Sequence, residues 1–170
     1  MNTLAQPKAA VAVVHHFDSN SVLLIRRPQN PKDPWSGHLA FPGGRIEEKD
    51  PTILDTAIRE TYEETGLKLT QKQFKRKLHI GYAGRTMQAL IAVQPFLFSL
   101  RGVLPIIKPD PKEVADYYWL NLEEFSQIER HTTQPLAKGV PNETMPCFAI
   151  DNFWLWGFTY QILLKEFVSI

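Results

Sequence analysis

Two short runs decide the fold of this chain: FPGG at residues 41–44 and, after fourteen further residues, RETYEETGL at residues 59–67. The second run places three carboxylates, Glu60, Glu63 and Glu64, within little more than one helical turn. Residues three or four positions apart lie on one face of a helix, so we expect the three carboxylates to converge. Like charges at this spacing repel by roughly 0.2–0.5 kcal/mol per pair. The cluster therefore indicates a bound divalent cation, whose common use is phosphate chemistry.

A helix is expected to carry these carboxylates over residues 51–65. Asp50 and Pro51 are typical of a helix start, with Asp50 as the N-cap and Pro51 at the first helical position. Gly66 is typical of a left-handed residue that ends a helix. The apolar stripe that should face the core consists of Ile53, Leu54, Ala57, Ile58, Thr61 and Tyr62.

The rest of the chain predicts mainly strands. We expect strands near residues 9–16, 22–27, 78–82, 88–100, 114–120 and 145–151. Further helices are expected near residues 122–128, capped by Asn121, and 156–167. This order of elements predicts an α+β fold, a mixed sheet between helices in an α/β/α sandwich. We expect residues 1–170 to form a single domain.

Composition excludes several classes of function. The 170 residues carry a net charge of +1, so no broad basic field favours nucleic acid or an anionic membrane. No apolar run approaches the ~20 residues that span a bilayer, and the N-terminus lacks the pattern of a signal peptide. Cys147 is the only cysteine, which excludes an intramolecular disulfide and suits a reducing compartment. We therefore expect a cytoplasmic protein.

The segment 44–67 resembles the Nudix box of hydrolases that act on nucleoside-diphosphate-linked compounds. That pattern ends Arg-Glu-(aliphatic)-any-Glu-Glu-any-Gly-(aliphatic). The matching fixed positions are Gly44, Arg59, Glu60, Glu63, Glu64 and Gly66. Thr61 stands where an aliphatic residue is usual, and the spacing from Gly44 to Arg59 is one residue longer than in the general box. The first acidic position of the box therefore falls on Asp50.

The longer spacing resembles the coenzyme A pyrophosphatase branch of the family. The runs TAIRE at 56–60, GHLAFPGG at 37–44 and LWGFT at 155–159 are also similar to that branch. The upstream signature differs, because RRP at 26–28 and WS at 35–36 stand where the branch has a Ser/Arg-containing segment. The resemblance implies hydrolysis of coenzyme A or a derivative. Nucleotide sugars, dinucleotides and nucleoside triphosphates are alternative substrates, and a non-catalytic nucleotide sensor is a third alternative.

The resemblance also implies roles for the box residues. Glu60 and Glu64 would hold Mg²⁺ or Mn²⁺, with the carbonyl of Gly44 completing the coordination. Glu63 would be a further ligand or the catalytic base, and Arg59 would support catalysis by orienting a box carboxylate through a bidentate contact. Glu64 and a loop acid remain alternative bases.

Residues outside the box are weaker candidates for substrate binding. Arginines could contact phosphates, an aromatic ring or a histidine could contact a base, and one more acid could contact the metal or water. These candidates are Arg26, Arg27, Arg45, Arg85, Trp35, His38 and Glu113. Trp154 and Trp156 are expected in the core or at an interface. The expected partner is a small nucleoside diphosphate derivative rather than nucleic acid or a membrane, and homodimers are common in the family.

Overall fold

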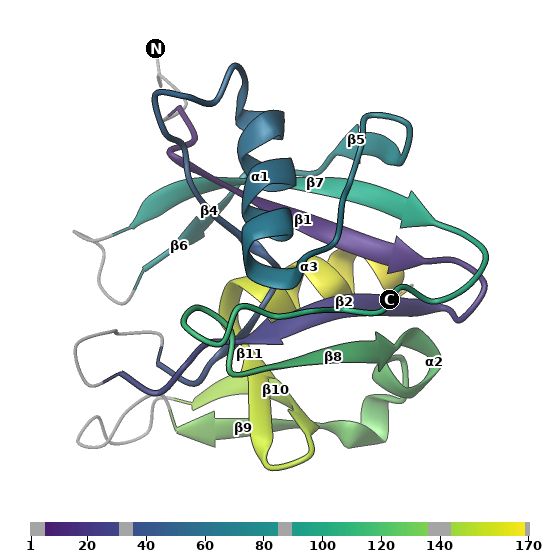
Figure 1. Cartoon of the computed structure of the whole chain (residues 1–170). Coiled ribbons are helices and arrows are strands. Elements are labelled where there is room, and N and C mark those ends of the chain that lie inside the picture. Colours follow the sequence, from purple (N-terminus) through teal and green to yellow (C-terminus); the bar gives the residue numbers. More distant parts are fainter. Residues whose placement is uncertain (1–5, 31–35, 85–89, 136–143, 169–170) are drawn as a thin grey trace.

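A mixed sheet forms the centre of the molecule. The computed structural model describes residues 6–30, 36–84, 90–135 and 144–168. The eight strands of the sheet in these residues are β1 (Ala9–His16), β2 (Ser21–Arg26), β3 (Leu39–Ala40), β4 (Gly43–Arg45), β5 (Phe74–Lys77), β6 (Gly81–Ala83), β7 (Ile91–Leu100) and β8 (Asp116–Asn121). Helix α1 (Ile53–Thr65) lies on one face and α3 (Gly157–Phe167) on the other (Figure 1). The expected α/β/α arrangement is confirmed.

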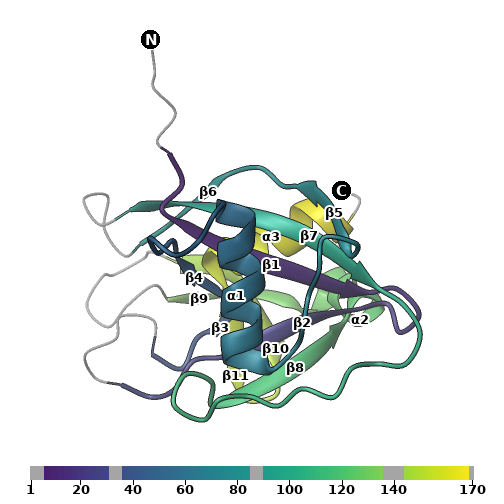
Figure 2. The ribbon, with the colours of Figure 1, turned by 45° about the horizontal axis from the view of Figure 1, so that its top comes forward.

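The central strand β1 is buried on both faces. Ala12 and Val14 belong to the core between the sheet and α1, whereas Val13 belongs to the core that α3 helps to form. Successive side chains of a strand point to opposite faces, so two covered faces require an almost continuous apolar strand. Figure 2 shows α1 crossing in front of β1, with α3 behind the sheet.

Strand pairing around β1 brings the FPGG turn to the helix. β1 runs parallel to β7, from the pair Ala9 and Val93 to the pair His16 and Leu100. The start of β1 also pairs with β4, which joins Ala10 to Gly44. Because α1 packs against both β1 and β4, the two sequence runs that define the box meet at this end of the sheet.

A second sheet packs beside α3. Its three strands in the described residues are β9 (His131–Pro135), β10 (Thr144–Ile150) and β11 (Phe153–Trp156), and the short helix α2 (Leu122–Phe125) precedes them. Phe125, Phe148 and Tyr160 join this sheet and α3 to the core of the main sheet. The His131 ring connects the layers, since Nδ1 lies 2.8 Å from the Tyr160 hydroxyl. β11 leads directly into α3.

Both ends of α1 are fixed by local hydrogen bonds. At the start, Thr52 is the N-cap, and its hydroxyl accepts a hydrogen bond from the Asp55 N–H. The expected N-cap at Asp50 is therefore wrong, and the helix begins two residues later than predicted. At the end, Gly66 is left-handed (φ 69°) and donates to the Tyr62 carbonyl, as expected. Tyr62 itself is 48% exposed, so its predicted place on the core stripe is also wrong.

The remaining strands differ from the sequence expectations in detail. The strand expected over residues 78–82 is replaced by two strands, β5 and β6, which are separated by residues 78–80. Both pair with β7, at different positions along it. The helix expected over residues 122–128 ends at Phe125, although Asn121 caps it as predicted. Strands β3, β4, β9 and β11 were not expected. In the part of the chain that the structure describes, no helix is both long enough and apolar enough to cross a membrane.

Candidate active site

Glu60 and Glu64 face the turn that contains Gly43 and Gly44. Glu64 is only 4% exposed, and its Oε2 accepts a hydrogen bond of 2.9 Å from the Gly43 N–H. Gly44 lies against the Glu60 carboxylate so closely that a Cβ at this position would overlap it. The close packing of backbone and carboxylate explains why a residue without a side chain stands at position 44.

Arg59 organises the acidic groups around it. Its Nε and Nη2 donate to the two oxygens of Asp50 at 2.8 and 2.9 Å, which is a bidentate contact. Its Nη1 donates to Glu60 Oε1 at 2.9 Å and to Glu63 Oε2 at 2.7 Å. Nη2 also donates to the Arg45 carbonyl at 3.2 Å. One guanidinium therefore fixes the helix carboxylates relative to the loop that precedes the helix.

Asp50 anchors Arg59 instead of capping the helix. Its side chain is 3% exposed, and it also accepts hydrogen bonds from Thr56 Oγ1 and the Glu47 N–H, both at 2.9 Å. The hydrogen bonds from Arg59 are the main reason that the pKa of Asp50 lies well below its ordinary value. The longer box loop thus contains a buried acid, Asp50, whose carboxylate accepts hydrogen bonds from four donors.

The three helix glutamates do not all converge, contrary to the sequence expectation. Glu63 is 42% exposed and is held by Arg59 and, at 3.7 Å, by the Lys49 ammonium. Within the described residues, no three His, Cys, Asp or Glu side chains gather closely enough to hold a metal ion by themselves. Glu60 and Glu64 remain as an inward-facing pair, one helical turn apart.

The surroundings of this pair disfavour its charged form when no cation is bound. Burial raises the pKa of Glu64 to about 8, and burial also raises the pKa of Glu60. The charge of Glu113 adds to both shifts, which places this loop acid within electrostatic reach of the pair. Magnesium commonly takes one or two carboxylates together with substrate phosphates and water. The residues therefore fit a divalent cation bound by two carboxylates.

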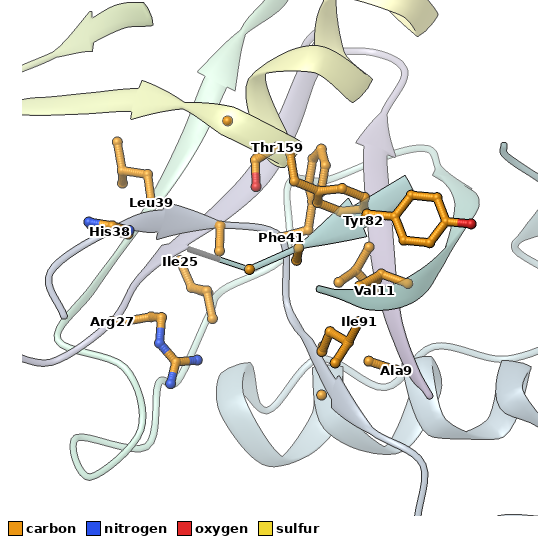
Figure 3. A pocket seen from close by; sticks show the side chains of 18 of the residues that line it. Ala9, Val11, Ile25, Arg27, His38, Leu39, Phe41, Tyr82, Ile91 and Thr159 are labelled. Atoms are coloured by element: carbon orange, nitrogen blue, oxygen red, sulfur yellow. The ribbon is translucent and has the colours of Figure 1, made fainter. Parts of the chain in front are cut away.

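A cavity of about 610 Å³ opens beside Glu64. Most of its lining comes from β1, β3, β4, β6, β7 and the start of α3 (Figure 3), with single residues from α1, β2, β10 and β11. On the side of the box, the lining includes Gly43, Gly44 and Arg45. The opposite wall includes Trp156 and Thr159. A cavity of this size, with an acidic pair at one wall, can hold a small organic phosphate.

The cavity gathers some of the predicted binding residues. Arg27, His38 and Arg45 line it, and the charge of Arg27 acts on Glu64. The His38 ring lies edge-on to Trp156, with 4.7 Å between the ring centroids. Arg26 does not line the cavity, because its guanidinium lies over the Phe153 ring at 4.3 Å. The predicted candidates Trp35 and Arg85 lie outside the described residues.

Sequence reasoning missed part of the cavity wall. Tyr82 and Thr159 line it, and Trp156 does so as well, although core or interface packing was expected for this tryptophan. The resemblance at residues 155–159 was the available signal. Only the fold shows that this segment lines the same cavity as the glycines of the box and Glu64.

Comparison with known proteins gives a family match over most of the chain. The family model described as "NUDIX domain" matches residues 6–140. An uncharacterized protein of Schizosaccharomyces pombe is 30% identical, and the match covers 77% of this chain but only 43% of that protein. The uncharacterized Nudix hydrolase NudL of Yersinia pestis is 26% identical, with 96% of this chain and 80% of NudL covered.

Solved structures show the same fold. A MutT/nudix family protein from Enterococcus faecalis has a TM-score of 0.64 at 19% identity, covering 97% of this chain and 62% of that chain. A C. elegans Ap4A hydrolase has a TM-score of 0.53 at 21% identity, and the match covers 72% of this chain and 85% of that chain. The NUDIX domain of Shewanella oneidensis NrtR, complexed with ADP ribose, has a TM-score of 0.54 at 22% identity. The match covers 72% of this chain and 77% of that chain.

Proposed function

The chain belongs to the Nudix family of pyrophosphohydrolases, and we propose that it cleaves the diphosphate bond of a nucleoside-diphosphate-linked metabolite with the help of a divalent cation. The observation that carries this proposal is the inward-facing pair of Glu60 and Glu64 beside a cavity of about 610 Å³. The alternative is an acidic helix face that only contacts solvent. It does not explain why Glu64 is buried, because a buried carboxylate needs a compensating partner such as a cation.

The chain's own residues supply the geometry for this reaction. Glu60 and Glu64 would hold Mg²⁺ or Mn²⁺, and by the same resemblance the carbonyl of Gly44 would be a further oxygen ligand. When bound, such an ion neutralises charge on the diphosphate and makes water more acidic. Arg59 acts as a positioning residue, because it fixes Glu60 and Glu63 against the buried Asp50. Catalysis then rests on positioning and electrostatics.

Glu63 is the proposed proton acceptor. It lies next to the metal pair in sequence, yet it is partly exposed and oriented by Arg59 at 2.7 Å. A base needs a fixed position and access to water. Glu63 is fixed by Arg59 and is partly exposed, whereas Glu64 is only 4% exposed. Glu64 and Glu113 are the other acids near the site. Replacement of each acid in turn distinguishes them.

Coenzyme A or a derivative is the leading proposed substrate. The support is the long box spacing together with the segment that contains Trp156, which resembles the coenzyme A branch and lines the cavity. The expected products are 3′,5′-ADP and a 4′-phosphopantetheine compound. Other nucleoside diphosphate compounds form the second candidate class, because two proteins of this fold are an Ap4A hydrolase and a domain complexed with ADP ribose.

A substrate panel tests both parts of the proposal. The panel holds coenzyme A, acetyl-coenzyme A, ADP-ribose, a nucleotide sugar, a dinucleoside polyphosphate and the common nucleoside triphosphates, each with Mg²⁺ or Mn²⁺. Glu63→Gln is compared with Glu129→Gln, a matched change at an exposed glutamate of another segment. Release of 3′,5′-ADP from coenzyme A, lost only in Glu63→Gln, supports the proposal. Turnover of a different compound would reject the coenzyme A assignment. Nucleotide binding without any turnover would favour a sensor.

A further inference from the structure

The start of α3 leaves backbone donors open to the cavity. The N-cap position is occupied by Trp156, which makes no side-chain cap hydrogen bond. In the described residues, no backbone acceptor outside the helix is bonded to the N–H groups of Phe158 or Thr159. The first N–H groups of a helix have no partner within it, and together they form the positive end of the helix dipole. The first turn of α3 also contains no acidic residue.

The side chain of Thr159 adds a second, independent feature. Thr159 is 6% exposed and lines the cavity, yet its hydroxyl has no hydrogen-bond partner among the described residues. Figure 3 shows this side chain at the start of α3, on the side of the cavity where Leu39 and Phe41 lie. The oxygen of this hydroxyl is not among the fully buried polar atoms that lack a partner, so it is accessible from the cavity and can donate to an acceptor that a ligand supplies there.

The first residue of α3 has open space beside it. Gly157 has φ +64°, and apart from its chain neighbours and its own helix no described heavy atom lies within 4 Å of the position that its Cβ would occupy. The edge-on contact between His38 and Trp156 holds the chain where it enters the helix. Arg27 and Arg45 line the same cavity, so positive charge surrounds a ligand on several sides. Backbone donors, a hydroxyl and nearby guanidiniums together match a phosphate group.

We propose that the first turn of α3, with the Thr159 hydroxyl and the N–H groups of Phe158 and Thr159, is a phosphate subsite. It lines the same cavity as Glu64 but belongs to α3 rather than to α1, so it would contact a phosphate through donors that are separate from the metal pair. The inference rests on the proposed function, which assigns the diphosphate bond that is cleaved. The phosphate is either an additional phosphomonoester of the nucleotide or the 5′-phosphate that stays with the nucleoside.

Metal-free binding of 3′,5′-ADP and 5′-AMP tests the subsite by isothermal titration calorimetry. Neither compound contains a diphosphate bond, so the result does not depend on hydrolysis. Thr159→Val keeps the side-chain shape but removes the hydroxyl, and we expect about tenfold weaker binding because a hydrogen bond to a charged group is lost. Thr159→Ser keeps the hydroxyl and should restore binding. This rescue separates a ligand contact from a packing role.

The two compounds identify the phosphate. Weaker binding of 3′,5′-ADP alone assigns the subsite to the additional phosphomonoester, and equal weakening of both compounds assigns it to the 5′-phosphate. Wild-type affinity in Thr159→Val for both compounds, failure of Thr159→Ser to restore binding, or no binding to the wild-type protein would each overturn the proposal. If Thr159→Val does not fold, ¹⁵N NMR of the wild-type protein decides. The amide signals of Phe158 and Thr159 must then shift with 3′,5′-ADP, and unchanged signals reject the subsite.

Discussion

Replacing Asp50 by asparagine tests the link between the box loop and α1. The Asp50 carboxylate is 3% exposed and accepts four hydrogen bonds, two of them from Arg59. Asparagine keeps the shape but must direct its NH₂ group at one of these donors. Breaking a buried ion pair costs about 3–5 kcal/mol. Arg59 keeps Glu60 and Glu63 as partners, so we expect Asp50→Asn to lower the free energy of unfolding by about 2 kcal/mol at pH 7.

The effect of Asp50→Asn should depend on pH. Because Arg59 holds the pKa of Asp50 below its ordinary value, the stabilisation is present above that ordinary value, near pH 4. It is lost as the pH falls through that value toward the lowered pKa of the folded protein. The difference between wild type and Asp50→Asn should therefore be largest at neutral pH and shrink below about pH 4.

Urea unfolding followed by tryptophan fluorescence measures this difference. Asp151→Asn is the matched control, because Asp151 is exposed and its left-handed backbone (φ 50°) suits asparagine equally well. We expect the control to change the free energy of unfolding by less than about 0.5 kcal/mol. A similarly small effect of Asp50→Asn at pH 7, or a large effect that is independent of pH, would refute the anchoring role of Asp50.

Further changes separate stability from activity in the box. Glu64→Gln should abolish most turnover but raise the free energy of unfolding of the metal-free protein by about 2 kcal/mol at pH 7, because the Glu64 carboxyl, whose pKa is raised to about 8, must take up a proton on folding at this pH and glutamine need not. Unfolding in EDTA at pH 7 and pH 4 checks this, since the gain should vanish near the ordinary pKa of glutamate; a loss of stability at pH 7 would contradict it. Gly44→Ala should reduce kcat more than tenfold, because the methyl group displaces the Glu60 carboxylate. Steady-state kinetics beside Glu129→Gln checks this, and wild-type kcat would show that Glu60 need not stay in place.

Local sequence signals predicted α1 and the central strands well. The run of alanine and valine in β1 indicated a strand, and Gly66 indicated the end of α1. The start of α1 was predicted wrongly for a physical reason. Asp50 and Thr52 are both good N-cap residues, and the choice depends on Arg59, whose approach to Asp50 is a tertiary contact.

Other features required the fold itself. Strands β3 and β4 have two and three residues, too few for an alternating pattern to appear. The helix spacing could place Glu63 near Glu60 but could not show that Glu63 stays 42% exposed, between Arg59 and the Lys49 ammonium. Likewise, Thr159 reaches the cavity only because β11 delivers α3 to the wall opposite Glu64. Long-range packing of this kind leaves no local pattern in the sequence.

Binding of Mn²⁺ tests the central claim most directly. Electron paramagnetic resonance of free Mn²⁺, titrated with protein, measures affinity without any assumption about the substrate. Glu64→Gln and Glu60→Gln are compared with Glu129→Gln, whose exposed side chain lies in a different segment. The account predicts Mn²⁺ binding by the wild type and by Glu129→Gln, with affinity lowered at least about tenfold in the two box variants. Equal Mn²⁺ affinity in all four proteins would contradict the assignment of the metal to the Glu60 and Glu64 pair.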